Sequence, residues 1–259
     1  MKLINIFSSV LLAVLLSSCD NGGTDPKPVD PSIVINKAGL LTVNETWNAD
    51  SIYVLTGRFV IDAGVTLTIE PGTIIKGKEG DGANASVLIV SKGGLIDAQG
   101  TADQPIVMTS VLDNINVGQR NGSNLDETDK GLWGGLIILG DAPISANAST
   151  SLIEGLPANE PWAEYGGSNP TDNSGTITYM SVRHGGTLIG DGNEINGITF
   201  GGVGSGTTID HIEVFATLDD GVEFFGGTVN VSNVSVTAQG DDGFDIDQAY
   251  SGTIDNFVY

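Results

Sequence analysis

The sequence is poor in cysteine, in basic side chains and in aromatic rings. Its 259 residues include one cysteine, 10 Lys and Arg against 32 Asp and Glu, and 6% Phe, Trp and Tyr. A single cysteine excludes an intramolecular disulfide framework. The net charge of -22 disfavours anionic partners, so we expect no nucleic-acid partner. The 37 glycines and the lack of a long amphipathic helical period indicate many short strands.

The N-terminal region reads as an export signal followed by a lipid anchor. An apolar run over residues 10–16 leads into Leu16-Ser17-Ser18-Cys19, which resembles the lipobox of bacterial lipoproteins. The resemblance implies a signal peptide over residues 1–18 and an acylated Cys19 that holds the protein at a membrane. Residues 19–36 are rich in Gly, Asp and Pro and predict a flexible tether. An ordinary signal peptide with an incidental cysteine is the alternative.

Internal repeats of about 22 residues dominate the rest of the chain. One series has steps of 24 and 22 residues, and a second has steps of 22 and 23, at residues 197–200, 221–224 and 243–246 and at residues 208–212, 230–234 and 253–257. A single repeat of short strands cannot bury its inward face, so successive repeats must stack. The pattern predicts an all-β fold, a right-handed parallel β-helix over residues 37–259; a β-sandwich is the competitor.

Stacking in this register places Val222 over Phe244 and Phe224 over Ile246 on the inside of the helix. An earlier pair of strand-turn-strand units, residues 64–75 and 85–96, lies 21 residues apart and is expected to form adjacent coils in the same way. The last residues fall within a strand of the second series, so we expect further coils beyond residue 259.

Two stretches interrupt the repeats, residues 112–130 and 147–174, and both are rich in Asn, Asp, Ser and Gly. We expect them to be inserted loops that leave one face of the helix. Trp133 follows the first of these stretches, and Trp162 lies within the second. They are expected to cap coil edges, and stacking on sugars is the alternative.

Acidic residues at the ends of two successive repeats are the main candidates for chemistry. The segments 219–223 and 241–245 stack Asp over Asp and Glu over Asp, on strands roughly 4.8 Å apart, where like charges repel. A hard cation relieves that repulsion, and Ca²⁺ is the candidate cofactor. The predicted ligands are Asp219, Asp220, Glu223, Asp241, Asp242 and Asp245. Protonation of one acid in each pair, and simple screening by solvent, are the alternatives.

Several motifs resemble those of a family of β-helix lipoproteins of Gram-negative bacteria. The similarity extends over residues 57–259 and includes the segments 66–73, 100–106 and 131–135 and the two Asp-Asp-Gly motifs. It implies a right-handed β-helix attached to the outer membrane or the cell surface, and it implies no particular activity.

Two enzyme classes show a weaker resemblance. Asp220, Asp241 and Asp242 are similar in arrangement to the stacked aspartates of polygalacturonase-type hydrolases, which implies a catalytic role for them. The chain departs from that family in lacking its Asn-Thr-Asp, Gly-His-Gly and Arg-x-Lys motifs. A pectate-lyase-like elimination needs a basic group, and after residue 130 the only Lys or Arg is Arg183, beside His184. An ion pair on the outer face is the other role open to Arg183.

The sequence therefore predicts a lipid-anchored protein of the outer membrane, on its periplasmic or outer side, and a monomer in solution. Its acidic β-helix face is expected to act as a binding or adhesion module for glycans or surface proteins, with Ca²⁺ as part of the site. The alternative is a polysaccharide-degrading hydrolase or lyase that uses the stacked aspartates.

Overall fold

The computed structural model of the chain describes residues 33–153, 156–190 and 193–259. The predicted signal peptide, the lipidation site Cys19 and the tether up to residue 32 lie outside these residues. The last four residues assigned to the tether are not part of a tether, because strand β1 begins at Ile33 and pairs with β3 from Ser51 onward. No helix in the described part of the chain is long and apolar enough to cross a membrane.

Short strands make up almost all of the regular structure, joined by two single-turn 3₁₀ helices, η1 (Gly82–Asn84) and η2 (Pro161–Ala163). The strands are β1 (Ile33–Leu41), β2 (Glu45–Trp47), β3 (Ser51–Ile61), β4 (Thr66–Ile69), β5 (Ile74–Gly77), β6 (Val87–Val90), β7 (Leu95–Gln99), β8 (Ile106–Ser110), β9 (Leu136–Leu139), β10 (Ser151–Leu152), β11 (Glu164–Tyr165), β12 (Gly175–Arg183), β13 (Leu188–Gly190), β14 (Asn193–Glu194), β15 (Ile198–Gly201), β16 (Thr208–Phe215), β17 (Val222–Phe225), β18 (Asn230–Thr237), β19 (Phe244–Asp247) and β20 (Ile254–Val258).

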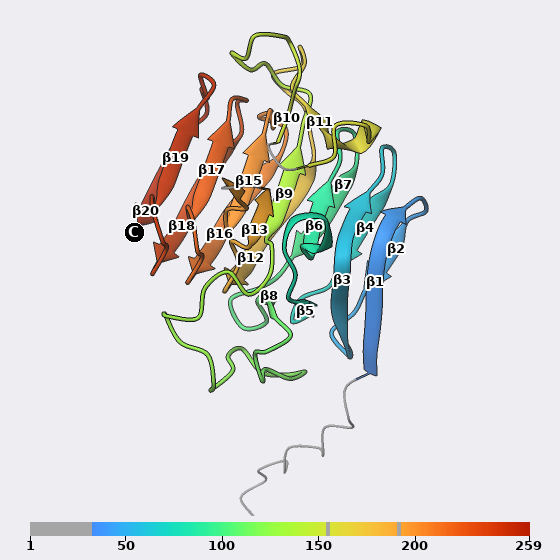
Figure 1. The fold of residues 1–259 in the computed structure, drawn as a ribbon, viewed down its shortest axis with the longest axis vertical. Helices are drawn as coiled ribbons and strands as arrows, with labels where there is room; N and C mark the ends of the chain where they lie inside the picture. Colours follow the sequence, from blue (N-terminus) through green and yellow to red (C-terminus); the bar gives the residue numbers. More distant parts are fainter. Residues whose placement is uncertain (1–32, 154–155, 191–192) are drawn as a thin grey trace, which may run out of the picture. The chain divides into compact units, whose positions relative to one another are not determined.

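Sixteen of these strands form one sheet in which every pairing is parallel, and the sheet winds into three faces (Figure 1). Face 1 consists of residues 39–41 of β1 and 58–61 of β3, followed by β6, β9, β15, β17 and β19. Face 2 consists of residues 33–37 of β1 and 51–55 of β3, then β5, β8 and the second halves of β12, β16, β18 and β20. Face 3 consists of β2, β4, β7 and the first halves of β12, β16, β18 and β20.

The long strands β12, β16 and β18 serve two faces because each bends at one residue. That residue has a positive φ, at Tyr179 (49°), His211 (54°) and Asn233 (54°). A single left-handed residue turns the chain sharply without ending the ladder on either side. The chain thus visits face 3, face 2 and face 1 in turn, and the fold is the predicted right-handed parallel β-helix.

The register predicted for the C-terminal coils is confirmed. Val222 pairs with Phe244 and Phe224 pairs with Ile246, and the strands β16, β18 and β20 stack in the order of the second repeat series. Val222 and Phe224 are buried in the core, whereas Ile246 is 54% exposed because β19 has a neighbour on one side only among the described strands.

The stacking predicted for residues 64–75 on residues 85–96 is wrong. Strand β4 pairs with β7, so that Thr66 lies beside Leu95, and strand β6 pairs with β3 and β9. The two units share a strand-turn-strand pattern, but the first passes from face 3 to face 2 and the second from face 1 to face 3. Similar sequence therefore marks similar local structure here and not the same position in the coil.

Both predicted loops are insertions between consecutive strands of the helix. Residues 112–130 lie between β8 and β9, and residues 147–174 lie between β9 and β12, where they include the β10–β11 pair. A third insertion, between β12 and β15, contains the β13–β14 pair and was not predicted. These insertions lengthen the middle coils. Strands far apart in the sequence are therefore neighbours in the sheet, and Ile137 pairs with Ile89 on one side and with Thr199 on the other.

The core contains columns of apolar side chains from all three faces. Phe200 and Phe224 stack with ring centroids 5.2 Å apart, and the ring centroids of Phe224 and Tyr250 are 4.4 Å apart. Trp133 is fully buried in this core and its Nε1 donates to the carbonyl of Arg183 at 2.7 Å, so it is a structural residue and does not stack on sugars. Trp162 is half-buried against a second apolar cluster outside face 1.

Candidate functional site

The outward-facing column on face 1 changes from apolar to acidic along the helix. Consecutive strands place Ile89, Ile137, Thr199, Glu223 and Asp245 beside one another, in that order. The apolar members are buried under the inserted segments, including residues of β11 and of the β13–β14 region. Glu223 and Asp245 are only partly buried, which leaves the acidic end of this column accessible.

The acidic residues predicted to stack lie together at this end. The prediction that Glu223 stacks on Asp245 is confirmed by their pairing in the sheet. Two groups of carboxylates form, in each of which one oxygen per residue lies within 4.8 Å of the others; they are Asp219 with Asp220 and Asp241, and Asp220 with Glu223 and Asp245. Asp220 belongs to both groups and is the buried member at their centre.

Asp242 differs from the other five predicted ligands. Among the described residues its carboxylate is in neither group, and its backbone N–H donates to Asp220 Oδ1 at 2.9 Å. Asp242 is exposed and fixes the position of the Asp220 side chain through its main chain. The sequence therefore predicted the stacking of the two Asp-Asp-Gly segments and placed one carboxylate too many in the cluster.

Close contact between the two Asp-Asp-Gly turns explains their glycines. The N–H of Gly221 donates to the carbonyl of Asp242 at 2.9 Å, which ties one turn to the next. A Cβ at Gly221 would lie 2.2 Å from Val236 Cγ1, a distance that no side chain tolerates. Glycine at this position thus lets successive turns stack on the core while the adjacent acids face outward.

Burial and mutual repulsion change the acidity of the cluster. Burial raises the pKa of Glu223 to about 8, against a smaller opposing effect of its hydrogen bond from Asn196, and the nearby Asp220 and Asp245 charges raise it further. Burial also raises the pKa of Asp220 to about 6, helped by Asp219 and Asp245. The pKa of Asp219 is raised in the same direction, first by burial and then by Glu194. The fully ionised cluster is thus unfavourable without a counter-ion.

A hollow of about 280 Å³ adjoins the cluster. Its lining combines the apolar residues Ile137, Ile153, Ile189, Ile195 and Phe225 with the polar residues Glu194, Asn196, Thr199, Asp219 and Glu223. Asn196 is 4% exposed, and its Nδ2 donates to Glu223 Oε2 and, at 3.3 Å, to Thr199 Oγ1. Its Oδ1 is buried without a hydrogen-bond partner. Buried amide oxygens normally accept a hydrogen bond or bind a cation. Asn196 Oδ1 therefore has an unfilled position for a hydrogen-bond donor or a cation.

Asn196 and Glu194 were not among the predicted site residues. The repeat contained the signal for Asn196, because it precedes Gly197 as Asp220 precedes Gly221 and Asp242 precedes Gly243. The three positions are equivalent in successive coils. Asn196 carries no charge and so did not stand out among the acidic residues, although amide oxygens are also ligands of Ca²⁺.

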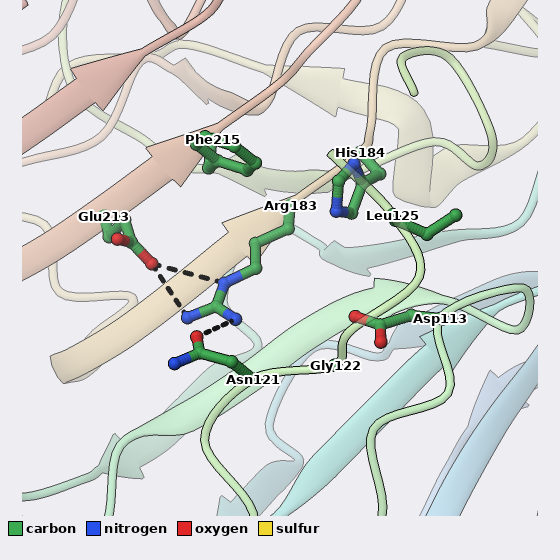
Figure 2. A pocket seen from close by; sticks show the side chains of 8 residues that line it. All are labelled: Asp113, Asn121, Gly122, Leu125, Arg183, His184, Glu213 and Phe215. Atoms are coloured by element: carbon green, nitrogen blue, oxygen red, sulfur yellow. Dashed lines mark hydrogen bonds and ion pairs between the residues drawn. The ribbon is translucent and has the colours of Figure 1, made fainter. Parts of the chain in front are cut away.

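Arg183 and His184 lie on face 2 and line a different hollow, which shares no lining residue with the acidic pocket. Arg183 is held in an ion pair with Glu213, with Nη2 and Oε2 3.0 Å apart (Figure 2). This is the outer-face ion pair that the sequence offered as one role for Arg183. A paired guanidinium is not available as the base of an elimination reaction.

The fold and this site define a class of protein, a parallel β-helix with a carboxylate-lined pocket on one outer face. Residues 39–259 match the family model described as a pectate-lyase-like beta helix domain. The chain belongs to this family. Searches of curated proteins and of solved structures return no match.

The raised pKa of Glu223 predicts a pH dependence of stability. An acid with a higher pKa in the folded state binds its proton more tightly there, so the free energy of unfolding falls as the pH rises from about 4.5 to about 8. Replacing Glu223 with Gln removes this contribution, and the variant is expected to exceed the parent in stability by about 1–2 kcal/mol near pH 8 and to match it near pH 5.

Urea denaturation at both pH values in the presence of a chelator measures this difference. Glu127→Gln, at an exposed position in the loop 112–130, is the control and is expected to follow the parent at both pH values. A Glu223→Gln variant with the same pH slope as the parent would show that Glu223 is ionised in the folded protein at neutral pH.

Proposed function

We propose that the protein is a lipid-anchored binding module of the outer membrane that captures glycans with the help of Ca²⁺ in the acidic pocket of face 1. The observation that carries the proposal is the convergence of two three-carboxylate groups on Asp220 beside a hollow open to solvent. Ca²⁺ is bound by six to eight oxygens from carboxylates, amides and water. Asp219, Asp220, Glu223, Asp241 and Asp245 would hold the ion.

The donor set fits such an ion in two further respects. Every group that faces the cluster is an oxygen donor, and among the described residues of these groups there is no His or Cys to favour a softer metal. Asn196 supplies a buried amide oxygen that has no partner. A bound cation supplies the positive charge that lets these acids ionise together and that polarises sugar hydroxyl groups at the open side of the pocket.

The pocket itself suits a ligand that is partly apolar. Four isoleucines and Phe225 line the hollow together with the carboxylates of Glu194, Asp219 and Glu223. Sugars present apolar C–H faces together with hydroxyl edges, so a lining of apolar and polar side chains matches a sugar ring. Attachment through Cys19 would place this pocket near the glycans of the envelope.

A polysaccharide-degrading enzyme is the second candidate, and the unequal acidities favour it. Asp220 has a pKa of about 6 and Glu223 a pKa of about 8, so Asp220 is the one suited to act as a base and Glu223 the one suited to act as an acid. Asp220 and Glu223 belong to one group, in which one oxygen per residue lies within 4.8 Å of the others. This spacing is nearer to the roughly 5–5.5 Å between the carboxyl groups of a retaining pair than to the roughly 6.5–9.5 Å of an inverting pair, so it disfavours inverting hydrolysis only. We place binding first because the carboxylate cluster and the unpartnered amide oxygen of Asn196 favour a bound cation.

Retention on immobilised polysaccharides, with Ca²⁺ or with a chelator, tests the proposal. The full-length chain in detergent is expected to be retained on at least one bacterial or plant polysaccharide in Ca²⁺ and to elute when the ion is chelated. The same fractions are assayed for new reducing ends and for unsaturated sugar products. Release of either product by the parent, lost in Asp220→Asn, would establish the enzyme instead.

A further inference from the structure

The hollow on face 2 is a separate site with its own chemistry. It has a volume of about 180 Å³ and lies between the ends of β12 and β16 and the inserted loop 112–130. Figure 2 shows the side chains that surround it, from the strands on one side and from the loop on the other. Its lining includes Arg183, His184, Glu213, Phe215, Asn121 and Leu125.

Arg183 neutralises the charge of Glu213 and links the two sides of this hollow. Its Nε and Nη2 donate to Glu213 Oε2 at 3.2 and 3.0 Å, and its Nη1 donates to Asn121 Oδ1 at 2.8 Å and to the carbonyl of Arg120 at 3.0 Å. The guanidinium thus ties the loop to strands β12 and β16. Because its charge is already paired with Glu213, it offers little attraction to an anionic ligand.

His184 is held with one ring nitrogen committed to the protein. The side chain is 3% exposed, its Nδ1 lies 2.6 Å from the carbonyl oxygen of Asp129, and its ring meets Phe215 edge-on with centroids 5.6 Å apart. A carbonyl only accepts, so Nδ1 carries the proton and Nε2 of the neutral ring is an acceptor. Figure 2 shows the imidazole turned toward the space between Arg183 and Asp113.

The backbone at His184 is also unusual. Its φ is +59°, in the left-handed region that side chains other than Gly rarely adopt, and its N–H donates to the carbonyl of Phe215 at 2.9 Å. Such a conformation is unfavourable and persists only where the surroundings hold it. The strand pairing and the Asp129 contact together fix the imidazole at the inner end of the hollow.

The side chains that line the hollow include hydrogen-bonding and apolar groups. Asn121 uses its Oδ1 for Arg183, which leaves its NH₂ as a donor, and Glu213 uses Oε2 for Arg183 and Ser181, which leaves Oε1 as an acceptor. Leu125 and Phe215 supply apolar surface. Hydroxyl groups both donate and accept, so a polyhydroxylated molecule matches this combination of donors, acceptors and apolar area.

Charge and size narrow the ligand further. Asp113 is 4% exposed and both of its carboxylate oxygens accept hydrogen bonds, from Thr109 and from the N–H of Ile115. Lys76 Nζ donates to the carbonyl of Asp113 at 2.7 Å, so the charge of Asp113 is offset as that of Arg183 is, and neither Lys76 nor Arg183 offers the hollow an unpaired cation for an anionic sugar. A hollow of about 180 Å³ is below the usual range for drug-sized ligands and suits a single ring. We propose that this hollow binds one neutral sugar residue, with a ligand hydroxyl donating to His184 Nε2.

The chain has two histidines, which makes the test selective. Imidazole ¹⁵N resonances of the full-length chain are followed while methyl β-glucoside, methyl β-galactoside or methyl α-mannoside is added, in a chelator. At least one of these neutral probes is expected to shift the His184 Nε2 resonance in a saturable way. His211, which stacks on Tyr179 at a bend between faces 3 and 2, is the internal control and is expected not to shift.

Two variants separate this site from the acidic pocket. Leu125→Trp fills the hollow without removing any of the hydrogen bonds described, and it is expected to weaken sugar binding at least about tenfold with the His211 resonance unchanged. Asp220→Asn is expected to leave it unchanged. The proposal is overturned if no neutral probe shifts His184, if Leu125→Trp binds as the parent does, or if galacturonate binds more tightly than every neutral probe.

Discussion

Asparagine at Asp220 is expected to weaken Ca²⁺ binding by about 100-fold, the largest effect of any single replacement in the acidic pocket. Asp220 is the only residue common to both carboxylate groups of the described cluster, and it is their buried member. Removing its charge takes one carboxylate from each group at once. The amide is nearly the same size and keeps an oxygen to accept from the N–H of Asp242. Calorimetric titration of the full-length chain with Ca²⁺ measures the loss.

Asp242→Asn is the matched control, because it makes the same change at the next repeat position. The carboxylate of Asp242 is in neither group, and the backbone N–H that it gives to Asp220 is retained. Its affinity for Ca²⁺ is expected to stay within about threefold of the parent. If Asp242→Asn loses as much affinity as Asp220→Asn, the ion is held by net charge and not by the cluster.

Stability without the ion should change in the opposite direction. Burial and the neighbouring acids raise the pKa of Asp220, which means that its ionised form is disfavoured in the folded chain. Asp220→Asn is therefore expected to be at least as stable as the parent at pH 8 in a chelator, and to gain less stability than the parent from added Ca²⁺. A misfolded variant would lose stability in the chelator as well as Ca²⁺ binding.

Alanine at Trp133 is expected to lower the free energy of unfolding by about 3–5 kcal/mol, the largest effect on stability. The indole is fully buried, its Nε1 donates to the carbonyl of Arg183, and it lies over Gly77, where a Cβ would approach a ring carbon to 2.4 Å. The replacement leaves a cavity in the core and an unpaired carbonyl at the end of β12. Urea denaturation followed by circular dichroism measures the change.

Two further tryptophan variants give this prediction its controls. Trp133→Phe keeps an aromatic ring and loses the donor, and it is expected to cost about 1–2 kcal/mol. Trp162→Ala removes the same kind of side chain where it is half-buried against the apolar cluster outside face 1. It is expected to lower the free energy of unfolding by less than about 1.5 kcal/mol. Equal losses at the two tryptophans would contradict the assignment of Trp133 to the core.

Much of the fold could be read from the spacing of glycines and apolar residues. Val222, Phe224 and Phe244 alternate with polar residues at steps that recur, and a parallel β-helix is the fold in which such steps stack. The same reasoning failed for residues 64–75 and 85–96. A strand-turn-strand pattern specifies local structure, and it does not say which of three faces the strand occupies.

The site was predicted in outline for the same reason. Acids at equivalent repeat positions lie together in two cases, Asp219 with Asp241 and Glu223 with Asp245. Asp220 and Asp242 are also equivalent, but only the Asp220 carboxylate joins the cluster. Asn196 was not predicted because it carries no charge. The hollow at His184 could not be predicted, since the path of the inserted loop 112–130 follows no repeat and depends on contacts such as that between Asn121 and Arg183.

Anomalous scattering from crystals of the full-length chain grown in Ca²⁺ tests the central claim most directly, which is that the acids of face 1 form a cation site. The predicted result is an ion bound by Asp220 and by at least two of Asp219, Glu223, Asp241 and Asp245, at the roughly 2.3–2.6 Å typical of Ca²⁺. A well-ordered cluster that contains only water at saturating Ca²⁺ would contradict it.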